Sequence, residues 1–172
     1  LSMEEHGVPQ PPDIEKRWVF RTVQKLGVPL IVLIPLLALF GLFGESSRTV
    51  SASGAAPALE ITYPTRLRYN MTSPLVVSVA NISSQPAPTL TVSFDAGYIG
   101  TFSDVSFTPS VSEITEEAYL VHLNNVPAGE TRQVVVDVHA AQYWAHSGAV
   151  TASLGPEQPP TVGLELSTFV FP

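Results

Sequence analysis

Hydrophobic and polar residues alternate along most of the chain from residue 59 onward. Apolar side chains recur at every second position, as in Leu75, Val77 and Val79, or in Val134, Val136 and Val138. A period of two is typical of strands that bury one face. The predicted strands are residues 59–63, 66–70, 74–81, 89–95, 119–124, 131–139, 148–154 and 161–171. Because turn-forming Pro, Gly and Ser separate these short strands, we predict an all-β Ig-like sandwich of seven or eight strands over residues 59–172.

A second pattern is the apolar stretch Leu26–Gly44, nineteen residues without a charge between Lys25 and Glu45. A helix of that length would be roughly 28 Å long, close to the roughly 30 Å of a bilayer's hydrocarbon. We therefore predict a single transmembrane helix that acts as an uncleaved signal anchor. The alternatives are a buried core helix and a cleaved signal peptide, whose apolar run is normally shorter.

Basic and aromatic residues gather before this stretch, and we predict that they lie at the membrane interface. They are Lys16, Arg17, Trp18, Arg21 and Lys25. Since basic residues favour the cytoplasmic side, the N-terminus is expected in the cytoplasm and the C-terminal domain in a periplasm or extracellular space. The predicted organisation is a cytoplasmic tail (1–15), a basic juxtamembrane and transmembrane helix (16–44), a linker (45–58) and an extracytoplasmic β-sandwich (59–172).

Charge and cysteine content exclude several classes of function. The net charge is −7, and residues 45–172 hold eleven acids but only four bases. An acidic domain repels phosphate backbones, so no nucleic-acid partner is expected. The chain has no cysteine, which excludes disulfides, thiolate metal sites and cysteine nucleophiles.

Four residues of the predicted sandwich are candidates for binding a partner protein. Arg66 and Arg68 are two of the four bases in residues 45–172 and would share one side of a strand. They could dock an acidic partner surface or lipid headgroups, or form a salt bridge within the domain. Tyr143 and Trp144 form an aromatic turn, which could be a binding hot spot or cap the open end of the sandwich. The segment 98–119 is the longest irregular region and a further candidate contact surface.

Titratable residues give no catalytic constellation, so we expect no enzyme, no resident metal and no cofactor. His122 and His139 could bind a metal only if their strands paired, and exposed sheet histidines are commoner. Glu113, Glu116 and Glu117 could coordinate calcium but lack the spacing of a calcium loop. Two Asn-x-Ser/Thr sequences, at Asn70 and Asn81, fit the glycosylation acceptor pattern.

Parts of the chain resemble bacterial Ig-like (CARDB-like) modules of cell-surface and periplasmic proteins. The resemblance rests on LVVSVANISSQPAPTLTVSF (75–94), VPAGETRQVVVDVH (126–139) and GAVTASL (148–154). In that pattern a strand ends at an Asn, here Asn81, and a Pro-Ala-Gly-Glu turn, here 127–130, precedes alternating valines. The whole layout also resembles uncharacterised bacterial single-span membrane proteins. These resemblances imply binding or assembly, and they assign no catalytic site.

The expected function is that of a non-enzymatic accessory subunit in a larger membrane complex, respiratory or photosynthetic. Its partners would be integral membrane subunits and the lipid bilayer of a bacterial cytoplasmic membrane, with no small-molecule substrate. The alternative is a free-standing cell-surface module that binds a glycan, a peptide or an envelope component.

Overall fold

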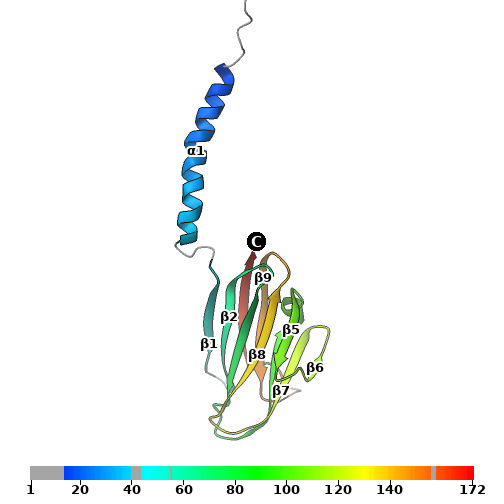
Figure 1. Cartoon of the computed structure of the whole chain (residues 1–172). Helices are drawn as coiled ribbons and strands as arrows, with labels where there is room; N and C mark the ends of the chain where they lie inside the picture. Colours follow the sequence, from blue (N-terminus) through cyan, green and yellow to red (C-terminus); the bar gives the residue numbers. More distant parts are fainter. Residues whose placement is uncertain (1–13, 40–43, 55, 156–157) are drawn as a thin grey trace, which may run out of the picture. The chain divides into compact units, whose positions relative to one another are not determined.

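The computed structural model describes residues 14–39, 44–54, 56–155 and 158–172 (Figure 1). The chain divides into two units, Leu1–Gly44 and Glu45–Pro172. The first contains helix α1 (Ile14–Leu39). The second contains the strands and a short helix, α2 (Ala96–Ile99), and we call it the β-domain.

Helix α1 corrects the prediction of a transmembrane helix over Leu26–Gly44. In the part of the chain that the structure describes, no helix has the combined length and hydropathy that crossing a membrane requires. The helix begins at Ile14, within the basic segment, and ends at Leu39. It therefore takes up only fourteen residues of the apolar stretch, 26–39. Those residues rise about 21 Å, less than the roughly 30 Å of a bilayer's hydrocarbon.

The described residues of the β-domain form ten strands. Their bounds are β1 Ser46–Ala52, β2 Ala58–Arg68, β3 Thr72–Ala80, β4 Ala87–Asp95, β5 Phe102–Thr108, β6 Glu113–Ile114, β7 Ala118–Val126, β8 Thr131–Ala140, β9 Trp144–Ser153 and β10 Val162–Phe171. They pair in the order β5-β8-β3-β2-β10-β9-β4-β7-β6, with β1 added on β2. The predicted seven or eight strands are thus too few, and the strands belong to one continuous sheet.

This sheet curls so that its two halves face each other across a shared core (Figure 1). Phe107 of β5, at one end of the strand order, packs edge-on against Phe94 of β4, with ring centroids 5.4 Å apart. It also stacks on Tyr119 of β7 at 5.7 Å. Since β4 and β7 lie near the other end of the order, these contacts require the sheet to fold over on itself.

Strand β2 joins the two halves. Its first part pairs with β3 from Ala58 to Thr62, and its last part pairs in parallel with β10 from Arg66 to Arg68. Pro64 lies between the two pairings, where its missing N–H removes no hydrogen bond from either. The sequence predicted two strands separated at Pro64, whereas the structure has one strand that changes partner there.

The predicted linker 45–58 also needs correction, because it contains β1. This strand pairs antiparallel with β2, from Ser46 opposite Arg66 to Ala52 opposite Leu59. Its side chains are mostly small and polar, and four of the seven are exposed. A strand of this composition forms because pairing with β2 supplies backbone hydrogen bonds that do not depend on side-chain hydropathy.

The core confirms the predicted alternation. The alternating side chains of β3, β4 and β8 are fully buried, and the largest contribution per residue comes from Leu75, Leu90 and Phe94. The predicted contact surface in segment 98–119 is wrong at its start, since Tyr98, Ile99 and Phe102 are buried as well.

Candidate functional site

The apolar part of helix α1 exposes its side chains on every side. The exposed large side chains are Val28, Leu30, Ile31, Val32, Leu33, Ile34, Leu36 and Leu39. A helix turns about 100° per residue, so this set points in all directions around the axis. Lys25 is exposed, whereas the side chains of Lys16, Arg17, Trp18 and Arg21 lie outside the described residues. Their predicted role at a membrane interface, and the predicted location of the protein, stay predictions.

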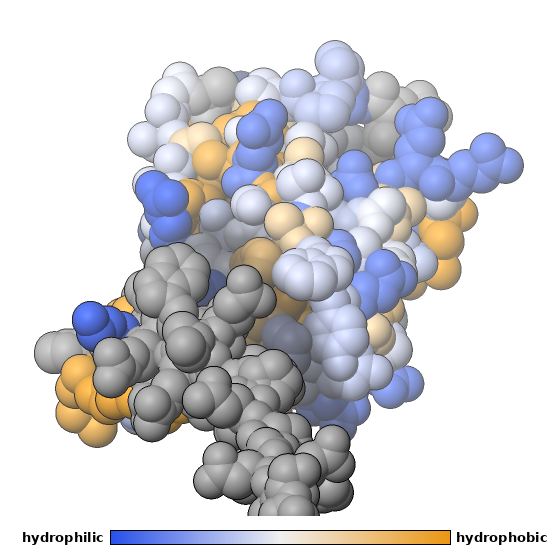
Figure 2. Space-filling view, turned by 90° about the horizontal axis from the view of Figure 1, so that it is seen from above, coloured by the Kyte–Doolittle hydropathy of each residue, from blue (hydrophilic) through white to orange (hydrophobic). Residues whose placement is uncertain are grey.

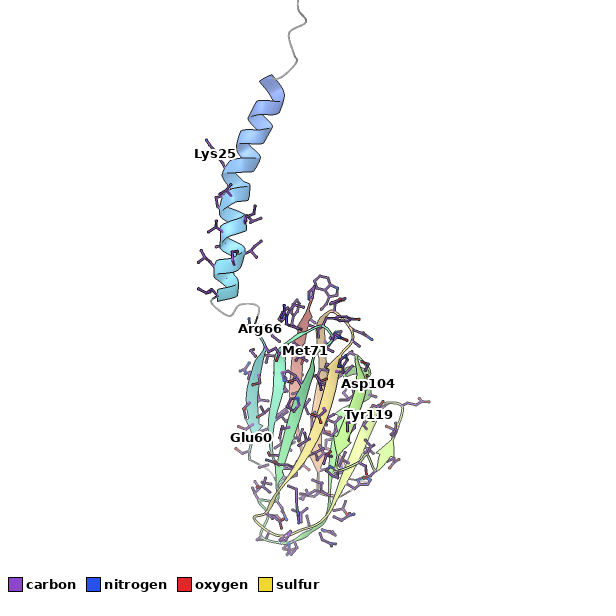
Figure 3. All side chains as sticks on the ribbon, viewed as in Figure 1. Lys25, Glu60, Arg66, Met71, Asp104 and Tyr119 are labelled. Atoms are coloured by element: carbon purple, nitrogen blue, oxygen red, sulfur yellow. The ribbon has the colours of Figure 1, made fainter. Side chains whose placement is uncertain are left out.

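A second exposed apolar surface lies at one end of the β-domain, and we call it the aromatic end. Its members are Tyr69, Met71, Tyr143, Trp144 and Phe169, each at least 40% exposed. They come from the β2–β3 turn, the β8–β9 connection, the first residue of β9 and the end of β10. Figure 3 labels Arg66 and Met71 toward this end, with Glu60 toward the other. Figure 2 looks onto the molecule from above and shows hydrophobic (orange) patches beside hydrophilic (blue) ones.

Sheet geometry places Phe169 on this surface. Leu166, Thr168 and Val170 of β10 face the core and are at most 1% exposed. Because successive side chains of a strand point to opposite faces, Phe169 must point outward. Its Cα partners are Arg66 on β2 and Ala145 on β9, and its ring lies 6.4 Å from the Trp144 ring in an edge-on contact.

The two turns of the aromatic end are tied together by backbone hydrogen bonds. The Asn70 N–H donates to the Ala140 carbonyl and the Ala140 N–H donates to the Met71 carbonyl, both at 2.9 Å. His139 adds two more contacts, from Nε2 to Asn70 Oδ1 at 3.1 Å and from Nδ1 to Thr72 Oγ1 at 3.0 Å. The Tyr69 and Tyr143 rings then stack with centroids 4.4 Å apart. The aromatic end is therefore a fixed platform.

Trp144 is the most exposed member of this platform and has an unusual backbone. Its side chain is 70% exposed and its φ is +83°. For a bulky side chain a positive φ is a strained conformation, since Cβ crowds the neighbouring carbonyl. Strain of this kind is commonest at functional sites, where the surrounding structure enforces it.

Arg66 and Arg68 flank the aromatic end. Both are exposed, while Leu67 between them is fully buried, so the two guanidinium groups share one face of β2. Arg68 is the Cα partner of Phe171, and Tyr69 donates its backbone N–H to the Phe171 carbonyl at 2.8 Å. The structure thus brings the predicted pairs Arg66–Arg68 and Tyr143–Trp144 to one end of the β-domain. Their role in partner binding stays a prediction.

Beneath the aromatic end, Tyr98 is a buried aromatic residue with a structural role. Its hydroxyl donates to Thr168 Oγ1 at 2.8 Å, because the Thr168 hydroxyl itself donates to the Pro64 carbonyl at 2.6 Å. Burial of the hydroxyl raises the pKa of Tyr98 from 10.0 to about 12. Gly148 makes room for this side chain, since a Cβ there would lie 2.3 Å from Tyr98 Cβ.

The opposite end of the β-domain is organised around Asn81, and we call it the asparagine end. Asn81 is 0% exposed. Its Nδ2 donates to the carbonyls of Gln85, Val126 and Pro127 at 3.0–3.2 Å, and its Oδ1 accepts from Ser83 Oγ at 2.6 Å. Because Nδ2 is buried in these bonds, the glycosylation pattern at Asn81 is not accessible in the folded domain, whereas Asn70 is exposed.

The histidines and acids considered for chemistry are dispersed. Strands β7 and β8, which carry His122 and His139, are not neighbours in the sheet, so the condition for a shared metal site is not met. His122 Nδ1 lies 3.0 Å from Thr91 Oγ1, and His146 Nε2 lies 3.1 Å from the Gln142 carbonyl. Among the described residues, no group of three or more His, Asp or Glu could hold a metal ion.

A shallow depression of about 470 Å³ also crosses β9 and β10. It is lined by small side chains such as Ser147, Ala149 and Ser167, and by Asp95 and Glu165. Asp95 caps α2, accepting from the Tyr98 N–H at 2.7 Å. The depression is therefore polar and acidic, and it differs in chemistry from the aromatic end.

Sequence reasoning identified two of the five aromatic-end residues and missed Tyr69, Met71 and Phe169 as members of one surface. The sequence could have predicted that Phe169 points outward. It lies between Thr168 and Val170 in TFVF (168–171), and alternate residues of a strand face opposite sides. No local signal could join residues 69–71 to 143–144, since only pairing between distant strands brings them together.

Comparison with known proteins gives likenesses of structure alone. No protein-family model matches this sequence, and no curated protein matches it significantly. One similar solved structure is the CARDB domain of a Pyrococcus furiosus protein in complex with di-metal ions, at 12% identity and a TM-score of 0.44. The match covers 69% of this chain and 97% of that domain.

Two other similar structures come from different kinds of protein. WR4, an MSP family member of C. elegans, has 6% identity and a TM-score of 0.37, and the match covers 69% of this chain and all of that chain. A β-glucosidase from Listeria innocua, in complex with gluconolactone, has 11% identity and a TM-score of 0.34, over 74% of this chain and 16% of the enzyme. The CARDB structure is similar in fold alone, and the predicted single-span membrane layout finds no support in the part of the chain that the structure describes.

Proposed function

We propose that this chain is a non-enzymatic subunit of a larger protein assembly, and that partner subunits enclose its helix α1. The observation that carries the proposal is the exposure of large aliphatic side chains all around α1 between Val28 and Leu39. A helix that is apolar on every side is found buried among other apolar groups, not in water.

Contacts with protein on more than one side of α1 would bury more of its apolar surface than a contact on one side. Burying an aliphatic side chain of this size contributes roughly 1.5–3 kcal/mol, before the costs of association are subtracted. A pairwise contact between two helices covers only one stripe of each. Since Leu30, Val32 and Leu33 point in different directions, a groove or a group of helices with apolar side chains would match α1 better than a single helix.

The test is purification of the assembly with an affinity tag at the N-terminal end of the full chain. A C-terminal tag would disturb the aromatic end, which includes the end of β10. We expect a particle with a fixed stoichiometry of other subunits by size analysis. Replacing two exposed residues of α1 together, Ile31→Asp and Leu33→Asp, should lower the co-purifying fraction at least about tenfold, since each buries a charge in an apolar contact.

Lys25→Glu is the matched control, because it also changes charge on α1 but lies outside the exposed aliphatic set. It should leave the assembly intact. A wild-type chain that purifies as a single-chain particle would contradict the proposal and would support the alternative of a free-standing binding module.

A further inference from the structure

We propose that the aromatic end is a docking surface for the partner subunit that encloses α1, and that it takes an apolar protein surface flanked by carboxylates. The inference rests on the proposed function and adds a second, separate contact to it. It joins three observations on the β-domain: an exposed strained tryptophan, a fixed aromatic platform and a local excess of arginine.

The first observation is Trp144, whose exposure and backbone strain have little explanation in the stability of the fold. Its side chain contacts Phe169 edge-on, yet stays 70% exposed, and its backbone has a φ of +83°. Glycine would adopt this conformation without strain. A tryptophan that is both strained and exposed stabilises the domain poorly, whereas tryptophan and tyrosine are enriched at binding hot spots.

The platform is ordered before any partner arrives. Hydrogen bonds between Asn70, Met71 and Ala140 fix the two turns, and the Tyr69–Tyr143 stack fixes two of the rings. Binding to a surface that is already ordered loses less conformational entropy, so more of the contact energy appears as affinity. Free loops with the same composition would not have this property.

The arginines at the aromatic end indicate which kind of partner surface would bind there. Residues 45–172 hold eleven acids and four bases, yet Arg66 and Arg68 stand together beside Phe169 and Tyr69. At the opposite end Arg132 pairs with Glu130 at 2.8 Å. Arginine beside exposed aromatic rings suits an apolar surface with carboxylates at its rim, because guanidinium forms bidentate contacts with carboxylates.

The path of the chain indicates which partner meets this surface. Strand β1 begins at Ser46, opposite Arg66, so the chain enters the β-domain at the aromatic end. Six residues, 40–45, separate Ser46 from the last residue of α1. A subunit that encloses α1 would be linked to the β-domain through this short stretch of chain, which raises its effective concentration.

Site-specific photo-crosslinking in the assembled complex tests the inference. The photoreactive amino acid benzoylphenylalanine replaces Trp144, Ile31 or Gln85 in three separate full-length chains. Ile31 reports on α1, and Gln85 is an exposed control at the asparagine end. Crosslinked peptides are identified by mass spectrometry, and lipid adducts are scored separately.

We expect the probes at 144 and 31 to label the same subunit, with at least about tenfold more labelling from 144 than from 85. The peptide labelled from 144 should contain Asp or Glu beside apolar residues. Labelling from 31 without protein labelling from 144, or lipid adducts alone at 144, overturns this inference and leaves the proposed function intact. No protein labelling from either 31 or 144 overturns both.

Discussion

Asn81 and Trp144 lie at opposite ends of the β-domain. Asparagine is usually exposed and tryptophan usually buried, but here Asn81 is buried and Trp144 is exposed. The polar amide of Asn81 is fully buried, and three backbone carbonyls accept hydrogen bonds from its Nδ2. The indole of Trp144 is 70% exposed and packs against a single ring. Folding explains the first arrangement, because buried carbonyls need donors.

Folding does not explain the second arrangement. An exposed indole on a strained backbone adds little to stability, and the proposed docking surface would give it a role. The polar contacts of Asn81 are satisfied within the domain, whereas the aromatic end leaves large side chains exposed.

The largest expected effect is at the asparagine end. Asn81→Ala removes a buried amide that donates to the carbonyls of Gln85, Val126 and Pro127, and the bond to the Val126 carbonyl is itself buried. We expect a loss of about 3 kcal/mol in the free energy of unfolding. The measurement is urea denaturation of the full chain, with the circular dichroism of the sheet as the signal for unfolding. Gln85→Ala is the control, since it keeps the accepting carbonyl, and an equal loss in both variants would contradict the role of Asn81.

The next effect separates the buried aromatic residue from the exposed ones. The pKa of Tyr98 is raised to about 12 from 10.0 by burial. The unfolded chain therefore loses this proton first as pH rises, so the stabilisation is complete below pH 10 and is lost between about pH 10 and 12. Two pKa units correspond to about 2.7 kcal/mol.

The measurement is the free energy of unfolding at pH 9 and pH 12 for the wild type and for Tyr98→Phe. The variant should lose about 1 kcal/mol at pH 9 with the hydrogen bond to Thr168. It should show a weaker decline toward pH 12, because the remaining tyrosines are common to both proteins. Parallel declines in the two proteins would show that Tyr98 is not responsible.

A charge reversal at each end of the β-domain compares how much each end contributes to partner binding. Arg68→Glu, at the aromatic end, should weaken partner retention about tenfold, which corresponds to about 1.4 kcal/mol. Arg132→Glu changes the charge by the same amount at the asparagine end and breaks only the surface pair with Glu130, worth about 0–1 kcal/mol of stability. Retention is measured as the fraction of the complex that survives increasing salt. Equal losses in both variants would indicate a general charge effect.

The sequence predicts some parts of this contrast better than others. The alternating valines of β3 and β8 follow from period-two burial, and they are buried as predicted. The shared face of Arg66 and Arg68 follows from the same periodicity. Strand β5 was missed because a β-bulge between Ser103 and Ser106 interrupts its alternation.

Other parts depend on tertiary structure. The polar segment 46–52 becomes a strand only because the edge of β2 is there to pair with it. The aromatic end is assembled from three segments that are distant in the sequence, so composition alone cannot reveal it. The error over Leu26–Gly44 arose because apolar length was counted without knowing where the helix begins and ends.

The smallest expected effect is at Trp144, which by this proposal serves contact with a partner and not stability. The measurement is the free energy of unfolding of the full-length Trp144→Gly variant. It is obtained by urea denaturation, with the circular dichroism of the sheet as the signal. Glycine relieves the strain at φ +83° but loses the contact with Phe169. We predict a stability that is unchanged or higher by up to about 1 kcal/mol. A loss of about 2 kcal/mol or more would show that Trp144 is a structural residue and would contradict the account.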